Sequence, residues 1–249
     1  IGVRLVGSEM CIRDRELAII SQKAKLQPIA NESLNKLENG LKSINSVESY
    51  NQLIKKCGGM LLNVVNDIML LANIKQNKLN ISLEKCNIVP FIYQSCEIFT
   101  PEMHKNNITI NYDLPETLEC NVDIFRFQQV LANIISNSVK YNKTNGSINV
   151  HGFIDESNEY LHIKIKDTGI GIPQAFIPSA TDPFKRINEH AHNISGTGLG
   201  LSIAKEMLQV MNGSMQIESV FGEWTQVTIT FANLTPFNKN KTSNENTLN

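Results

Sequence analysis

The chain has 249 residues, of which 41% are hydrophobic, so it is long enough for one or two domains with buried cores. Its 23 basic and 24 acidic residues leave a formal net charge of -1, and no basic surface for a nucleic acid is expected. No apolar run approaches the roughly 20 residues of a membrane span, and five scattered cysteines without metal-ligand spacing favour a reduced, cytoplasmic setting.

The two ends of the chain differ in composition from the rest. The chain begins at Ile1 rather than at a methionine, and residues 1–15 look like translated cloning-adapter sequence. We therefore expect this segment to be non-native and leave it out of the fold. Residues 234–249 are rich in Asn, Lys, Ser and Thr and are expected to form a disordered tail.

Residues 16–78 are expected to form a helical hairpin. Residues 16–44 have helical periodicity, and Asn45-Ser46 interrupts it. A second helix follows, whose apolar residues alternate in steps of three and four: Ile54, Cys57, Leu61, Val64, Ile68 and Leu71. This spacing is typical of a coiled-coil seam and predicts an antiparallel hairpin that dimerises into a four-helix bundle. The alternative is an ordinary helical subdomain packed on its neighbour.

Residues 79–233 are expected to form one mixed domain. Strand-like alternation occurs in six segments: 79–83, 108–112, 147–154, 160–166, 214–219 and 225–231. Helical periodicity occurs in three: 90–103, 123–141 and 199–211. Because helices and mainly antiparallel strands are segregated, we expect an α+β sandwich rather than a doubly wound sheet.

Asparagines mark one face of the helix expected over 123–141. Asn133 and Asn137 lie four residues apart and share a face, and Lys140 and Tyr141 follow on nearly the same side. Amides on the buried side of an apolar helix are costly unless they are satisfied. A nucleoside triphosphate with Mg²⁺ would satisfy them, since Mg²⁺ keeps several waters and needs few protein oxygens. The alternative is that the two asparagines simply cap or solvate the helix.

A first glycine turn follows the strand expected over 160–166. Asp167 ends this strand, and its carboxylate can accept a hydrogen bond from an adenine amino group. Gly169 and Gly171 would let the backbone approach the ring. The alternative is an ordinary turn, because Asp-Thr-Gly is a common turn sequence.

A second glycine turn precedes the helix expected over 199–211. Its glycines, Gly196, Gly198 and Gly200, leave backbone N–H groups free to hold phosphates at a helix N-terminus. Such a turn also arises by chance, so alone it does not identify a site.

The segment between the two turns, 185–195, has little apolar content and is typical of a mobile lid. Its two histidines, His190 and His192, have the side chains for a metal site but fit a solvated lid better.

The motifs gain specificity from their order. An Asn-x-x-x-Asn helix, an Asp-x-Gly-x-Gly turn, Asp182-Pro183-Phe184 and a Gly-x-Gly-x-Gly turn follow one another. This order resembles the catalytic ATPase domain of sensor histidine kinases, whose wider fold is shared with gyrase and MutL proteins. The resemblance covers roughly residues 47–231. Trp224 replaces a usual glycine of the last hairpin, and Thr181 stands where the family often has an aromatic residue.

The resemblance implies binding of Mg-ATP, with Asn137 as the Mg²⁺ ligand, Asp167 on the adenine, and Lys140, Tyr141 and the lid near the phosphates. The ATP-binding residues that it implies are Asn133, Asn137, Lys140, Tyr141, Asp167, Gly169, Gly171, Ile172, Phe184, Lys185, Arg186, Gly196, Thr197, Gly198, Leu199, Gly200, Leu201 and Thr225.

The phosphate acceptor of this family is missing from its expected place. Such kinases phosphorylate a histidine on the first helix of the hairpin, and the family's spacing falls near Lys23, with Ala24 in place of the neighbouring acid. All five histidines lie beyond the hairpin: His104, His151, His162, His190 and His192. A lysine ammonium has no lone pair until it loses a proton, at a pKa of about 10.4. We therefore expect ATP binding without self-phosphorylation, unless the segment 1–15 has displaced the first helix.

The resemblance implies the core of a sensor histidine kinase, of the simple or the hybrid type, that transfers the γ-phosphate of ATP to histidine in a two-component phosphorelay. Its implied partners are a second copy through the hairpin and a receiver domain or response regulator, with no nucleic acid. A cytoplasmic location is expected, either for a free protein or for the cytosolic part of a membrane receptor, with no membrane segment in this chain. Two alternatives are a non-catalytic ATP-binding scaffold that regulates a partner kinase and, more distantly, a gyrase- or MutL-type ATPase.

Overall fold

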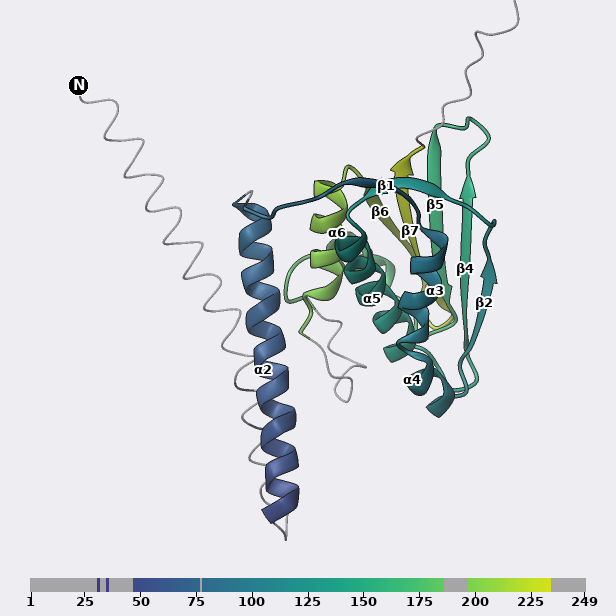
Figure 1. The fold of residues 1–249 in the computed structure, drawn as a ribbon. Coiled ribbons are helices and arrows are strands. Elements are labelled where there is room, and N and C mark those ends of the chain that lie inside the picture. The colour runs from purple at the N-terminus through teal and green to yellow at the C-terminus, as the bar shows by residue number, and fades with distance from the viewer. Residues whose placement is uncertain (1–30, 32–34, 36–46, 77, 186–196, 234–249) are drawn as a thin grey trace, which may run out of the picture. The chain divides into compact units, whose positions relative to one another are not determined.

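The computed structural model describes residues 31, 35, 47–76, 78–185 and 197–233 (Figure 1). Contacts between Cα atoms divide the chain into two units, Ile1–Asn66 and Asp67–Asn249. The segments 1–15 and 234–249 lie outside the described residues, as does nearly all of the expected first helix, including Lys23 and Ala24.

Helix α2 spans Val47–Lys75 and confirms the second expected helix. Ile54 and Leu61 of its apolar stripe are 57% and 55% exposed, whereas Leu71 near its end is buried. By length and hydropathy alone, the segment Tyr50–Lys75 would also allow a membrane crossing, and 11% of its most apolar window is buried. Helix α2 thus carries large apolar side chains that are exposed.

The larger sheet contains five strands in the order β2-β4-β5-β7-β6. These strands are β2 (Thr109–Asp113), β4 (Ser147–Ile154), β5 (Tyr160–Asp167), β6 (Ser214–Val220) and β7 (Trp224–Ala232). Strands β2 and β4 are parallel, and the other neighbours are antiparallel. Side chains along β5 alternate between buried and less buried, so one face of the sheet forms the core.

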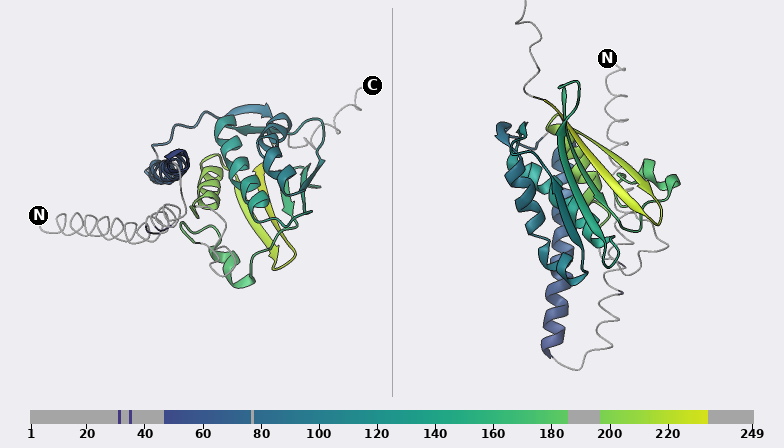
Figure 2. Two further views of the ribbon diagram at one scale, coloured as in Figure 1. Left: turned by 90° about the horizontal axis from the view of Figure 1, so that it is seen from below. Right: turned by 90° about the vertical axis from the view of Figure 1, so that its right-hand side faces the viewer.

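Helices α3 (Val89–Glu97), α5 (Ile124–Lys140) and α6 (Gly200–Val210) cover that face of the sheet (Figure 2). Helix α5 buries the stripe that its period predicts, including Phe127, Leu131 and Ile135. The expected α+β sandwich is therefore confirmed, with helices on one side of a mainly antiparallel sheet.

The strand expected over 79–83 is wrong. Leu79 and Ile81 pack against the core without joining a sheet. The backbone N–H of Ser82 donates to Asp123 Oδ2 at 3.1 Å instead of to a neighbouring strand. The strand begins later, as β1 (Glu84–Asn87), and pairs with an unexpected strand, β3 (Glu119–Val122).

The single helix expected over 90–103 is also wrong, because the chain forms two helices there. Helix α3 ends at Glu97, and α4 spans Thr100–Lys105 with a proline, Pro101, in its first turn. Proline has no N–H to donate to the preceding turn but fits the start of a helix, which explains the division. A short 3-10 helix, η1 (Gln174–Ser179), was likewise not expected.

Candidate nucleotide-binding site

Helix α5 carries the two asparagines. Its N-cap is Asp123, whose Oδ1 accepts a hydrogen bond from the Arg126 N–H at 3.0 Å. One face of the helix is buried in the core, and Asn133 and Asn137 lie half-buried at the margin of that face. The helix ends at Lys140, with Tyr141 as its C-cap.

The second glycine turn meets helix α5. A Cβ atom at Gly200 would have the side-chain amide of Asn133 as its nearest neighbour, with Oδ1 at 3.6 Å. Gly200 begins α6, whose N-cap, Leu199, makes no side-chain cap hydrogen bond. The first N–H groups of a helix have no partner within the helix and attract anions. An amide side chain and a helix N-terminus therefore lie side by side.

Asp167 lies at the end of β5 and is 5% exposed. Its Oδ1 accepts a hydrogen bond from the Gly169 N–H at 2.9 Å, and its partner across the sheet is Thr225. Burial raises the pKa of this carboxyl to about 6, although the Gly169 N–H, the Ser138 hydroxyl and the Thr225 N–H act in the opposite direction.

The first glycine turn packs closely against two other segments of backbone. A Cβ atom at Gly169 would lie 2.3 Å from the Tyr141 carbonyl oxygen. Gly171 has a φ of 67°, and a Cβ atom there would lie 2.1 Å from the Val220 carbonyl oxygen. The sequence analysis explained these glycines by the approach of an adenine ring. The structure adds a packing requirement that holds without any ligand.

Ser219 belongs to the same region and was not predicted. Its hydroxyl accepts a hydrogen bond from the Ile172 N–H at 2.7 Å and donates to the Trp224 carbonyl at 2.7 Å. It also lies 3.1 Å from the Thr225 hydroxyl. The available signal was a serine on the inward-facing side of an alternating strand, where a polar group needs a partner.

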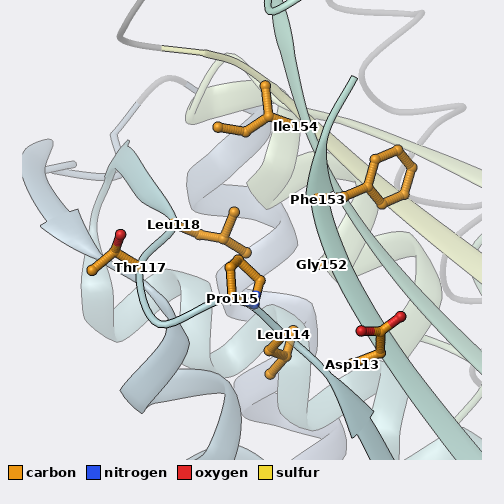
Figure 3. Close-up of a pocket in the computed structure, with 8 residues that line it drawn as sticks. All are labelled: Asp113, Leu114, Pro115, Thr117, Leu118, Gly152, Phe153 and Ile154. Atoms are coloured by element: carbon orange, nitrogen blue, oxygen red, sulfur yellow. The ribbon is translucent and has the colours of Figure 1, made fainter. Parts of the chain in front are cut away.

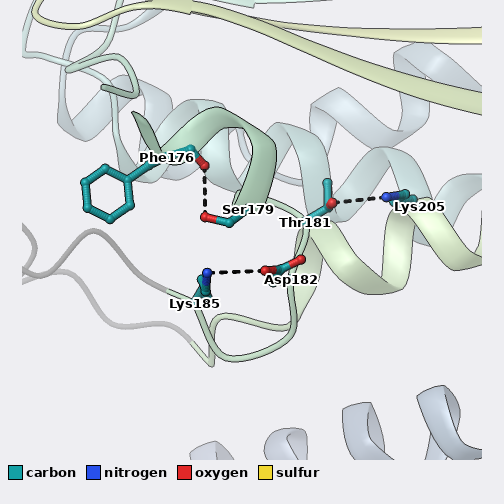
Figure 4. Close-up of polar contacts among 6 residues, drawn as sticks. All are labelled: Phe176, Ser179, Thr181, Asp182, Lys185 and Lys205. Carbon is teal, nitrogen blue, oxygen red and sulfur yellow. Dashed lines mark hydrogen bonds and ion pairs between the residues drawn. The ribbon is translucent and has the colours of Figure 1, made fainter. Parts of the chain in front are cut away.

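The Asp182-Pro183-Phe184 segment is tied to the second glycine turn. Phe184 has a φ of 65°, and its N–H donates to the Gly198 carbonyl at 3.0 Å. Two side-chain contacts hold this segment, Lys185 to Asp182 and Lys205 to the Thr181 hydroxyl, each at 3.3 Å (Figure 4). Arg186, Gly196 and the rest of the expected lid, with His190 and His192, lie outside the described residues.

Asp67 is a charged neighbour that was not assigned to the site. Its Oδ2 accepts a hydrogen bond from the Thr197 hydroxyl at 3.3 Å. Burial raises the pKa of Asp67, against the effects of Thr197 and Lys140. Partial desolvation lowers the pKa of Lys140, against the effect of Asp67. The carboxylate of Asp67 thus helps to keep Lys140 charged.

The predicted residues come together in three pairs: Asn133 with Gly200, Asp167 with Thr225, and Phe184 with Gly198. The Tyr141 carbonyl joins them by accepting the Ile170 N–H at 3.0 Å. Among the described residues, no group of three or more His, Cys, Asp and Glu side chains could hold a metal ion. An amide oxygen such as that of Asn137 suits a Mg²⁺ ion that keeps water and phosphate as its other ligands.

A separate pocket of about 450 Å³ lies between the β2–β3 connection and β4 (Figure 3). It is lined by residues 113–115, 117, 118 and 152–154. Leu114, Leu118 and Ile154 make this lining largely apolar, and Asp113 is its charged member. None of the predicted site residues lines this pocket, and an acidic, apolar wall does not suit phosphate.

This chain is similar in sequence to known proteins. Residues 122–235 match the family described as histidine kinase-, DNA gyrase B- and HSP90-like ATPases. The sensor histidine kinase WalK of Bacillus subtilis is 34% identical over 174 residues, which is 68% of this chain and 28% of that protein. The chain therefore spans less than a third of the length of this relative.

Two solved structures share the fold. Full-length ShkA in complex with AMPPNP has a TM-score of 0.64 and 22% identity, over 88% of this chain and 46% of that one. The histidine kinase ThkA in complex with the response regulator TrrA has a TM-score of 0.61 and 18% identity, over 89% of this chain and 62% of that one. These structures show the fold, and the sequence matches show that the chain belongs to the sensor histidine kinases and carries their ATPase-type catalytic domain.

Proposed function

We propose that this chain binds Mg-ATP at the junction of α5, the end of β5 and the N-terminus of α6, as the catalytic core of a two-component histidine kinase. The observation that carries the proposal is the meeting of Asn133 with Gly200, which joins an amide-bearing helix to a glycine-rich helix start. ShkA, which has the same fold, was solved with an ATP analogue.

In this proposal, different residues bind the adenine and the phosphates of the nucleotide. Asp167 accepts a hydrogen bond from the adenine amino group, with Thr225 and Gly171 beside it. The α6 N-terminus, from Thr197 to Leu201, holds phosphate through N–H groups, and Lys140 adds a positive charge. Asn137 supplies one oxygen to Mg²⁺, which when bound neutralises phosphate charge.

The test of this site is Mg-dependent binding of a fluorescent ATP analogue to the Asn137→Ala variant. We expect Mg-dependent affinity to be lost. The matched control is Gln128→Ala, because Gln128 lies on the same helix but bonds Gln94 on the surface at 3.3 Å. Unchanged affinity in Asn137→Ala would remove Asn137 from its proposed role.

The destination of the phosphate is a separate part of the proposal. Sensor kinases transfer the γ-phosphate to a histidine, but here Lys23 stands near that position, and His104, His151 and His162 lie on α4, β4 and β5 of the ATPase domain. We propose that the chain either phosphorylates histidine on a partner chain or regulates a partner kinase without catalysis. Residues 1–103 contain no histidine, which argues against self-phosphorylation on the hairpin and is compatible with both functions.

Radiolabelled ATP separates these functions. Acid-labile label on the chain alone would contradict the loss of self-phosphorylation, and label on an added kinase hairpin that contains histidine would identify transfer to a partner. ATP binding with no transfer to either would identify the regulatory function. We further propose a cytoplasmic location, a homodimer through the helical hairpin, and a receiver domain or response regulator as partner. The complex of ThkA with TrrA is the precedent for that partner.

A further inference from the structure

Two cysteines face each other across the small sheet of β1 and β3. In the antiparallel register of these strands, Cys86 is paired directly with Cys120. Directly opposed residues place their side chains on the same face of a sheet, with Cα atoms about 4.5–5.5 Å apart. That separation falls within the range of about 4.4–6.8 Å that disulfides span. Both thiols are free in the structure.

The register that pairs the two cysteines is fixed by neighbouring contacts. Asn87 Oδ1 accepts the Leu118 N–H at 2.9 Å, and Asn87 Nδ2 donates to the Glu116 carbonyl at 3.1 Å. On these strands, Lys85 also forms an ion pair with Glu119 at 2.8 Å. A slip by one residue would break all three contacts and turn the cysteines to opposite faces. These contacts therefore hold the two cysteines opposite each other on the same face of the ribbon.

We propose that Cys86 and Cys120 form a reversible cross-strand disulfide when the protein meets a low-molecular-weight disulfide such as oxidised glutathione. Cys86 is half-buried and reacts first, whereas Cys120 is 2% exposed and acts second. The proposal is independent of nucleotide binding, because neither cysteine belongs to the candidate site.

The reaction is two successive exchanges. The Cys86 thiolate attacks one sulfur of oxidised glutathione, which forms a mixed disulfide and releases one glutathione as its thiol. The Cys120 thiolate then attacks the Cys86 sulfur and releases the second glutathione. Two protein thiols are oxidised to one disulfide, and one glutathione disulfide is reduced to two thiols.

The surroundings of the thiols slow their oxidation. Burial raises the pKa of Cys120 to about 12, and burial together with the Glu84 carboxylate raises the pKa of Cys86. Thiolates, not thiols, carry out the exchange, so oxidation is slow at neutral pH and faster at higher pH. The pair therefore responds to a sustained oxidising shift.

The bond would enclose a loop that contains α3, α4 and β2. Closing a loop of this size restricts the unfolded chain and raises the thermal midpoint by roughly 5 °C or more.

The disulfide would lie away from the candidate nucleotide site. Asn133 lies ten residues beyond the Asp123 cap that follows β3, about 15 Å along α5. We expect nucleotide affinity to change little on oxidation.

The experiment uses the folded full chain treated with oxidised glutathione and digested with trypsin after alkylation. We expect peptide 86–105 to be linked to peptide 106–126, with the link placed on Cys86 by fragmentation, and the thermal midpoint to rise. Dithiothreitol should reverse both changes. Cys96→Ala should keep the link, since Cys96 shares a peptide with Cys86, and Cys86→Ser should abolish it.

Several results would overturn the proposal. One is a wild-type protein in which Cys86 carries glutathione but never joins Cys120. Another is a dominant link from Cys86 to Cys96, or between two copies through Cys57. Since Cys86 is half-buried, Cys86→Ser should fold, and its unchanged nucleotide affinity would verify this.

Discussion

At the scale of single residues, Asp167 links pH to both stability and binding. Burial raises its pKa from 3.8 to about 6 in the folded chain. The folded state therefore prefers the protonated carboxyl, so this group's contribution to stability increases as pH falls from above 6 to below 3.8. The full change is about 3 kcal/mol. Nucleotide binding should change in the opposite direction, because an ionised carboxylate is the better acceptor for the adenine amino group.

We expect affinity for an ATP analogue to weaken by up to about tenfold per pH unit below the pKa of Asp167. The measurement is a titration on either side of that pKa. Asp167→Asn is measured alongside, because the nucleotide's own phosphates titrate nearby. A wild-type profile that is parallel to that of the variant would show that Asp167 does not control binding.

Gly171 was assigned to a nucleotide site from its sequence motif, and the structure shows that its backbone conformation and packing also require glycine. Gly171→Ala should destabilise the protein by roughly 3 kcal/mol or more, through its positive φ and the close Val220 carbonyl. Gly222→Ala is the matched control: its φ is 86°, but no atom lies within 4 Å of the added Cβ. It should cost about 1–2 kcal/mol. Equal midpoints in urea unfolding for both variants would refute the clash.

At the scale of elements, the N-cap residue of α5, Asp123, connects this helix to the segment that precedes β1. Asp123 Oδ1 caps the helix at the Arg126 N–H, and Oδ2 accepts the Ser82 N–H. Asp123→Ala should therefore lower the free energy of unfolding by about 1–2 kcal/mol. Asp123→Asn keeps one acceptor oxygen and should lose less. Urea unfolding followed by circular dichroism measures both, and an alanine variant as stable as the wild type would contradict the cap.

The same region shows what periodicity predicts and what it misses. Helix α5 and strands β4–β7 were predicted because each buries one regular face against the core. Strand β1 was missed because it has four residues and depends on pairing with the distant β3. Leu79 and Ile81 alternate like a strand, yet they only pack on the core. A short apolar alternation does not distinguish these cases.

The residues of the candidate site also fall into two groups, those that sequence motifs indicated and those that they did not. Asn133, Asp167 and the glycines could be assigned to a candidate site from the sequence, because the order of their motifs resembles one family, and their roles stay predictions. Ser219 and the Tyr141 carbonyl were not, because their hydrogen bonds depend on which strands and turns meet in space. Backbone groups carry no sequence signal of their own.

At the scale of the whole molecule, the exposed apolar residues of α2 bear on whether this helix associates with other helices or inserts into a membrane. Leu61 and Val65 are 55% and 43% exposed, and Met69 is 59% exposed. The same helix carries Asn66 and Asp67 about two turns before its end, and a charge within the hydrocarbon is costly. An apolar stripe beside polar residues suits a helix bundle, in which one face is dry and the other wet.

We therefore expect the wild-type chain to sediment as a dimer without detergent. Leu61→Glu combined with Val65→Glu should weaken the dimer by roughly a hundredfold or more, because a buried, unpaired carboxylate costs several kcal/mol. Nucleotide affinity should stay unchanged, since neither Leu61 nor Val65 is among the residues of the candidate site. The control is Asn63→Glu with Asn66→Glu, which adds the same charge at two exposed polar positions of the same helix. If the wild type required detergent, or if the leucine and valine changes left the dimer intact, the apolar stripe would have another purpose. A dimer lost only with the apolar pair would show that the surface left uncovered within one chain is completed by a second copy.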